Sequence, residues 1–78
     1  MSATNEGHPH YSMVIEWSDE DQAFVVSIPE FPGNYTHGDT YEEAAKQGQD
    51  LIESLIMWAR QDGKPLPQPR EFAMHSAS

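Results

Sequence analysis

Cysteine is absent from the 78 residues of this chain, and long apolar runs are absent as well. Without cysteine the chain can form neither disulfides nor a thiolate metal site, which suits a reducing compartment. No stretch approaches the roughly 20 apolar residues that a membrane-spanning helix needs. Residues 1–10 lack the basic and apolar regions of a signal peptide. We therefore expect a soluble, cytoplasmic protein.

Basic residues are scarce: four Lys and Arg stand against thirteen Asp and Glu, which gives a formal net charge of −9. Proteins bind nucleic-acid backbones largely through Lys and Arg. We therefore expect no direct binding of DNA or RNA by this chain. Acidity of this degree keeps a small protein soluble, and it also favours encounter with a basic protein partner. Composition alone favours solubility as the reason for the acidity and leaves a basic partner open.

Motifs for catalysis or metal binding are also missing. The four histidines (His8, His10, His37 and His75) form neither a helical i, i+4 pair nor any other usual ligand spacing. The acidic run at 19–21 lacks the spaced oxygen ligands and the turn glycine of an EF-hand loop. The serines stand in no nucleophile elbow, and the glycines are too scattered for a phosphate loop. We therefore expect no catalytic residue, no metal and no cofactor.

The length of the chain allows one domain. Residues 1–10 are polar and without periodicity, and they are predicted to form a disordered tail. Residues 11–74 are predicted to form the single domain, and residues 75–78 a frayed end. A chain this short buries only about 60% of the surface that its unfolded form exposes. Self-association as a homodimer or homotetramer would bury more, so we predict it.

Alternating apolar residues predict the first two strands. Residues 11–18 carry Tyr, Met, Ile and Trp at every second position, and Phe, Val and Ile alternate in the same way over residues 23–28. The polar residues 19–22 between them predict the turn of an antiparallel hairpin.

Proline and glycine mark the next boundaries. Pro29 ends the second strand because it has no amide to donate to a ladder. Residues 30–33 are predicted to turn a corner, and residues 34–37 to form a short third strand. Gly38 is predicted to take a positive φ at the entry to the next element. Arg70 to Met74 are predicted to form a last strand at a sheet edge.

A helix is predicted from Thr40 onward. Thr40 and Glu43 have the spacing of a capping box, in which the hydroxyl accepts from the Glu43 amide and the Glu43 carboxylate reaches back. Gly63 is suited to end the helix. Between Thr40 and Gly63, apolar and small residues recur at three- and four-residue spacing and are predicted to form the buried face: Ala44, Ala45, Gly48, Leu51, Ile52, Leu55, Trp58 and Ala59. Gly48 is expected to allow close approach of the helix to the sheet. The larger aromatics are expected in the core or at an interface, namely Trp17, Phe24, Phe31, Trp58 and Phe72.

Two linked motifs carry a family resemblance. The strand that ends in Ser-Ile-Pro-Glu-Phe-Pro-Gly at 27–33 is followed by Gly-Asp-Thr-Tyr-Glu-Glu-Ala at 38–44. Together they resemble the signature of the HicB antitoxin family, and the likeness extends over residues 11–69. The positions that carry the motif are Pro29, Pro32, Gly33, Gly38, Asp39, Thr40, Glu43 and Ala44.

The resemblance implies an α+β domain of order β-β-β-α-β, described as a partial RNase H-like fold. It also implies an antitoxin that binds and blocks HicA, a small basic ribonuclease toxin. Acidic residues at the hairpin turn, the corner and the helix start are the candidate partner contacts: Asp19, Glu20, Asp21, Glu30 and Glu42. Two alternatives stay open, an oligomeric adaptor without a toxin partner and a small hydrolase that uses carboxylates such as Asp19, Asp39 and Glu43.

Overall fold

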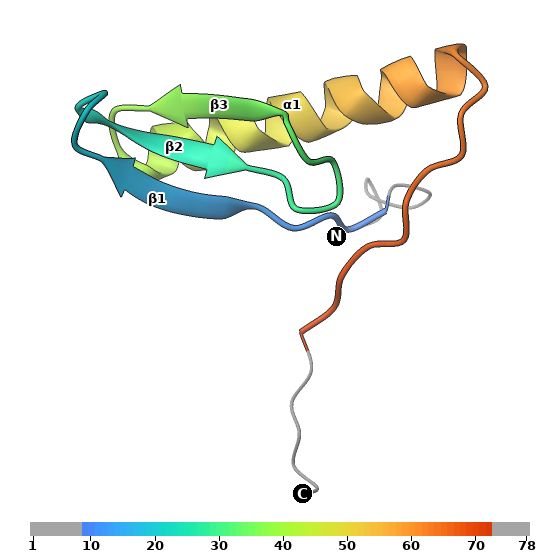
Figure 1. The fold of residues 1–78 in the computed structure, drawn as a ribbon, viewed down its shortest axis with the longest axis horizontal. Coiled ribbons are helices and arrows are strands. Elements are labelled where there is room, and N and C mark those ends of the chain that lie inside the picture. The colour runs from blue at the N-terminus through green and yellow to red at the C-terminus, as the bar shows by residue number, and fades with distance from the viewer. Residues whose placement is uncertain (1–8, 73–78) are drawn as a thin grey trace, which may run out of the picture.

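The computed structural model describes residues 9–72. They form three strands, β1 (Val14–Ser18), β2 (Ala23–Ser27) and β3 (Tyr35–Gly38), followed by one helix, α1 (Tyr41–Gln61). The strands make an antiparallel sheet of order β1-β2-β3, and α1 lies along one face of it and extends past its end (Figure 1). The predicted α+β class is confirmed. The tail predicted for residues 1–10 falls almost wholly outside the described residues, as does the frayed end at 75–78.

The register of the sheet sorts the strand residues onto two faces. Trp17 pairs with Phe24, and Phe24 with Gly38. Because side chains alternate across a strand, Ile15, Trp17, Phe24 and Val26 share the face that α1 covers. The predicted hairpin is confirmed, with strands a little shorter than the alternating segments.

A fourth strand is not formed by the described part of the segment that was predicted to supply it. Arg70 to Phe72 run without strand pairing, and Ala73 and Met74 lie outside the described residues. The amide of Arg70 donates instead to the carboxylate of Glu30 at 2.7 Å, so it is not available to a neighbouring strand.

Both ends of α1 are closed by the predicted residues. The Glu43 amide donates to the Thr40 hydroxyl at 3.0 Å, while the Glu43 carboxylate accepts from the amide of Asp39 at 2.8 Å, one residue before the cap. At the other end Gly63 has a φ of +69°, and its amide donates to the Arg60 carbonyl. The Lys64 amide donates to the Ala59 carbonyl at 2.9 Å, which completes a Schellman motif.

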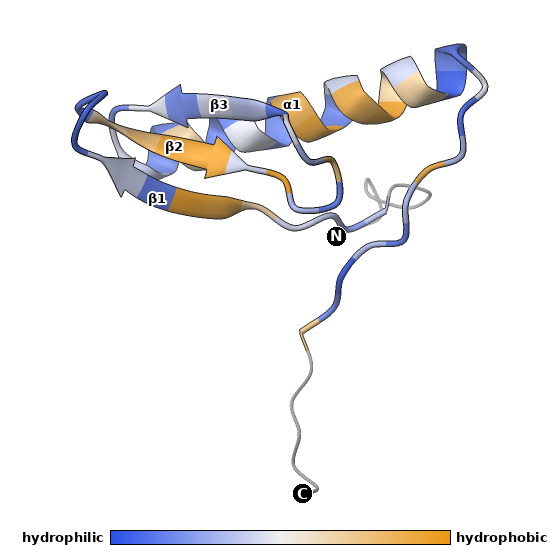
Figure 2. Ribbon diagram, in the orientation of Figure 1, coloured by the Kyte–Doolittle hydropathy of each residue, from blue (hydrophilic) through white to orange (hydrophobic). Residues whose placement is uncertain are grey.

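The core lies between α1 and the sheet, where the apolar parts of β2 and α1 face each other (Figure 2). Its buried residues are Tyr11, Val26, Ile28, Ala44, Leu55 and Ile56. The prediction that Trp58 belongs to the buried helix face was wrong, since Trp58 is 53% exposed and Ile56 only 4%. With 3.6 residues per turn, burial of the adjacent pair Leu55 and Ile56 leaves position 58 on the flank of the helix.

Two glycines are explained by close approach of the chain. Gly38 does not have the predicted positive φ, which occurs instead at Gly33 in the corner. A Cβ on Gly38 would lie 2.5 Å from the Ala44 amide nitrogen, so only glycine fits against the helix start. A Cβ on Gly48 would lie 2.8 Å from the Met13 sulfur, which confirms the predicted close packing of α1 on the sheet side.

Candidate functional site

The turn between β1 and β2 and the start of α1 meet at one end of the sheet. Ser18 pairs with Ala23, and Phe24 with Gly38, so the residues that follow Ser18 and Gly38 lie at the same end (Figure 1). We name this end the acidic end, because it carries the exposed carboxylates of Asp19, Glu20, Asp21, Asp39, Glu42 and Glu43. Four of the five predicted partner contacts, Asp19, Glu20, Asp21 and Glu42, are therefore brought to one end of the molecule.

Hydrogen bonds within the hairpin turn hold its carboxylates in place. The Ser18 hydroxyl donates to the Asp21 carboxylate at 3.0 Å and accepts from the Asp21 amide at 3.3 Å. The Gln22 side-chain amide donates to the Asp19 carbonyl at 2.7 Å, and Gln22 itself has a φ of +52°. The turn thus presents Asp19 and Asp21 from a defined backbone rather than from a loose loop.

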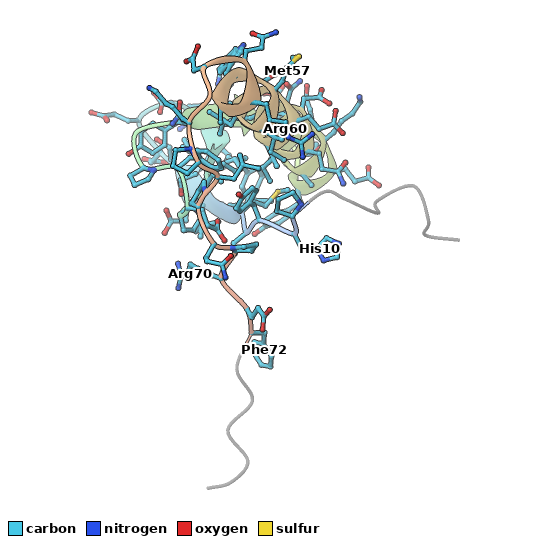
Figure 3. The ribbon with its side chains drawn as sticks, turned by 90° about the vertical axis from the view of Figure 1, so that its right-hand side faces the viewer. His10, Met57, Arg60, Arg70 and Phe72 are labelled. Carbon is cyan, nitrogen blue, oxygen red and sulfur yellow. The ribbon has the colours of Figure 1, made fainter. Side chains whose placement is uncertain are left out.

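The positive charges lie mostly at the opposite end. Arg60 occupies the last turn of α1, and Lys64 and Arg70 follow it, leaving Lys46 alone in the first half of the helix. Figure 3 views this second end, where Arg60 and Arg70 are labelled. Acids at the start of α1 and Arg60 at its end both complement the helix dipole. The molecule is therefore electrically polarised, with its negative charge concentrated at the acidic end.

Three aromatic rings form a row at the acidic end. The Trp17 and Phe24 ring centroids are 5.1 Å apart in an edge-to-face arrangement, and those of Phe24 and Tyr41 are 4.2 Å apart. Trp17 is 50% exposed and Tyr41 is 66% exposed. We name Trp17, Phe24 and Tyr41 the aromatic row. Tyr41 was not recognised from the sequence, although its position three and four residues before Ala44 and Ala45 places it on the same side of the helix.

Glu30, the fifth predicted contact, lies at the other end of the sheet and is engaged within the chain. Its carboxylate accepts from the Ser12 amide, the Ser12 hydroxyl and the Arg70 amide, at 3.1, 3.0 and 2.7 Å. Burial raises the pKa of Glu30, but these hydrogen bonds outweigh it and hold the pKa below its ordinary value. Glu30 thus has a structural role that sequence patterns did not indicate, because its donors lie far away along the chain.

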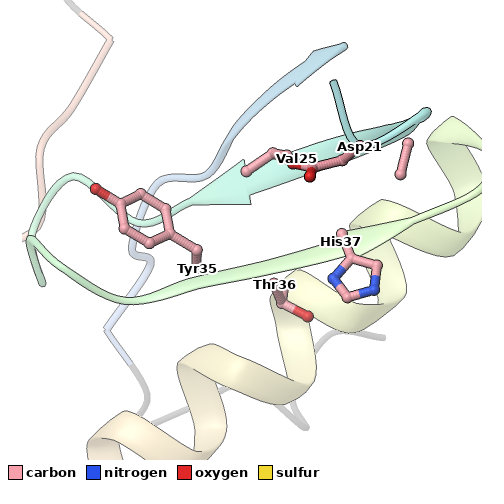
Figure 4. Close-up of a pocket in the computed structure, with 6 residues that line it drawn as sticks. Asp21, Val25, Tyr35, Thr36 and His37 are labelled. Atoms are coloured by element: carbon pink, nitrogen blue, oxygen red, sulfur yellow. The ribbon is translucent and has the colours of Figure 1, made fainter. Parts of the chain in front are cut away.

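A shallow pocket of about 370 Å³ opens on the sheet face away from α1 (Figure 4). It is lined by Asp21, Ala23, Val25, Tyr35, Thr36 and His37. Asp21 connects it to the acidic end.

Within residues 9–72, no three His, Asp or Glu side chains come together in a way that could hold a metal ion. Over the same residues, no helix combines the length and the apolar character required to cross a membrane.

Comparison with known proteins identifies the family of this chain. The family model described as "HicB_like antitoxin of bacterial toxin-antitoxin system" matches residues 11–78. A UPF0150 protein of Thermoplasma acidophilum is 29% identical over 68 residues, which span 85% of this chain and 97% of that protein. No solved structure matches the chain, so the likeness to a partial RNase H fold stays a prediction. The family model covers most of the chain, and the chain therefore belongs to the HicB-like antitoxin family of bacterial toxin–antitoxin systems.

Proposed function

We propose that this protein is a non-enzymatic antitoxin that acts in the cytoplasm and neutralises a small, basic, HicA-like ribonuclease by direct contact. The observation that carries the proposal is the gathering of Asp19, Glu20, Asp21 and Glu42 at one end of the sheet. Membership of an antitoxin family supports a toxin as the partner.

The chemistry of the partner explains why carboxylates would inhibit it. A ribonuclease must hold the phosphate backbone of RNA, and it does so largely with Lys and Arg side chains. The acidic end offers carboxylates to the same side chains and would exclude RNA by occupying them. Of the five candidate contacts, Glu30 is the exception, because it would have to give up its internal hydrogen bonds to bind a partner.

The test is the rate of association with a purified HicA-like basic ribonuclease from the same organism, measured at low and high salt. The triple variant Asp19→Asn, Glu20→Gln, Asp21→Asn removes three charges from the acidic end. A matched control, Asp50→Asn, Glu53→Gln, Asp62→Asn, removes three charges from the exposed side and the end of α1. Charges at an interface rim set the association rate and its salt dependence. We expect slower association with a flatter salt dependence in the first variant, and a smaller change in the control.

Equal effects of the two triple variants would contradict the assignment to the acidic end. They would show that net charge alone speeds the encounter. Failure of the parent protein to bind this ribonuclease or to inhibit its activity would contradict the antitoxin proposal itself.

We also propose that the protein self-associates as a homodimer or homotetramer. Apolar side chains outside the acidic end support this, since Val14, Tyr35 and Phe72 are 39%, 65% and 89% exposed. Val14 and Phe72 line one shallow hollow, and a contiguous exposed apolar patch often marks a contact with another chain. If the toxin test fails, an oligomeric adaptor is the second candidate function. Sedimentation that gives only monomer at micromolar concentration would count against both the oligomer and the adaptor.

A further inference from the structure

We propose that the aromatic row Trp17–Phe24–Tyr41 is the centre of the partner contact and receives the guanidinium group of an arginine from the basic partner. This inference rests on the proposed function and deepens it, because it names the side chain that the acidic end recognises.

The first argument is the exposure of the rings. Trp17 on β1 and Tyr41 on α1 leave half or more of their surface open, while Phe24 is partly buried between them. The helix packs mainly on β3 and β2 and touches β1 least, so Trp17 has Phe24 as its aromatic neighbour and an open side beyond it. Two large rings are thus held in fixed positions by a third, with faces or edges available to a ligand.

The second argument is the charge around the rings. The Trp17 indole N–H points to the Asp19 carboxylate at 3.4 Å, and Tyr41 follows the cap residue Thr40 and precedes Glu42. A cation within about 6 Å of an aromatic ring is attracted to its face. An arginine differs from a lysine in that its planar group stacks on a ring and also pairs with a carboxylate through two parallel hydrogen bonds. Rings flanked by carboxylates therefore favour arginine.

The choice of a basic partner over a second copy follows from charge. Two copies that met through this end would bring two sets of carboxylates together, and like charges across an interface oppose association. Of the four Lys and Arg residues, Arg60, Lys64 and Arg70 lie toward the opposite end, and Lys46 alone, in the first half of α1, does not offset the six carboxylates of the acidic end. A partner with exposed arginines has no such conflict. In that contact the aromatic row would lie at the centre and the carboxylates at the rim, as in many interfaces.

The test uses dye-labelled oligoarginine and oligolysine peptides of equal length, with binding followed by fluorescence anisotropy. The parent is expected to bind oligoarginine several-fold more tightly than oligolysine. Tyr41→Ser should weaken the binding of oligoarginine about three- to tenfold and reduce the preference over oligolysine. Tyr41→Phe, which keeps a ring, should bind like the parent.

Tyr35→Ser is the matched control, because Tyr35 is 65% exposed but lies on the other face of the sheet. It should leave the binding of oligoarginine unchanged. The protein has two tryptophans, so a Trp58→Phe background leaves Trp17 as the sole indole fluorophore. Its emission should change on addition of oligoarginine. Circular dichroism of each variant checks that the fold is retained.

The outcomes separate this inference from the proposed function. Loss of peptide binding in the Asp19, Glu20, Asp21 triple variant, with Tyr41→Ser unchanged, would overturn the aromatic row and leave the acidic end as the partner surface. Equal affinity for the two peptides together with an unchanged Trp17 emission would also overturn it. If the parent protein fails to bind the HicA-like ribonuclease of the same organism, the proposed function is contradicted, whatever the peptides show.

Discussion

The carboxylate of Glu30 accepts a 2.7 Å hydrogen bond from the backbone amide of Arg70, forty residues further along the chain. The same carboxylate holds Ser12, just before β1, through that residue's amide and hydroxyl. Close by, the Tyr11 hydroxyl donates to the Pro67 carbonyl at 2.6 Å, and the Tyr11 ring packs edge-to-face on Phe31 at 5.1 Å. Glu30 thereby ties the segment after α1 to the segment before β1.

Replacing Glu30 should release that segment. A hydrogen bond to a charged group contributes about 1.5–3 kcal/mol, and Glu30→Ala removes three such contacts at once. We expect a loss of at least about 2 kcal/mol in the free energy of unfolding, measured by chemical denaturation. Trypsin should also cleave after Arg70 faster than in the parent. Cleavage at the parental rate would show that Glu30 does not hold the segment.

The same carboxylate predicts how stability depends on pH. Hydrogen bonds hold the pKa of Glu30 below its ordinary value. At pH values between the folded pKa and the ordinary pKa, the folded state therefore binds fewer protons than the unfolded state. The stabilisation is complete above the ordinary pKa and is lost as the pH falls through the lower, folded pKa. Unfolding free energies measured from neutral to acidic pH should therefore fall less steeply in Glu30→Gln than in the parent. Glu53→Gln, which removes an exposed carboxylate from α1, is the control for the loss of one charge.

Gly38 and Gly63 are required for different reasons: a side chain at position 38 would clash with the helix backbone, whereas position 63 has a positive φ. Gly38→Ala would place a Cβ 2.5 Å from the backbone nitrogen of Ala44, so the start of α1 would have to move. Gly63→Ala meets nothing within 4 Å but must keep a φ of +69°, at a cost of about 1 kcal/mol. We expect thermal unfolding to show a clearly larger loss for Gly38→Ala. A smaller loss at position 38 than at position 63 would contradict the close approach.

The capping hydroxyl of α1 gives the simplest test of the helix start. Thr40→Ala removes the acceptor for the Glu43 amide and should lower the unfolding free energy by about 1 kcal/mol. Thr40→Ser, which keeps the hydroxyl, is the control and should stay close to the parent. An unchanged denaturation midpoint in Thr40→Ala would mean that the cap contributes nothing to stability.

Local interactions explain which features of this protein the sequence determined by itself. The hairpin, the cap at Thr40 and the end of the helix at Gly63 depend on residues within a few positions of each other, so their patterns predicted them. The family resemblance is of the same kind, because its two motifs lie between residues 27 and 44. The acidity of the hairpin turn and of the helix start was also visible along the chain.

Packing between distant segments decided the rest. The packing of α1 buries Ile56 in the same cluster as Tyr11, while Trp58 stays exposed and Trp17 stays open beside Phe24. The sheet register brings Asp19 and Glu42 to one end and makes Gly38 a contact of the helix backbone. Arg70 does not form the predicted strand, and its amide instead donates to the carboxylate of Glu30. No pattern along the chain predicts these relationships, since each depends on atoms that only the folded backbone brings together.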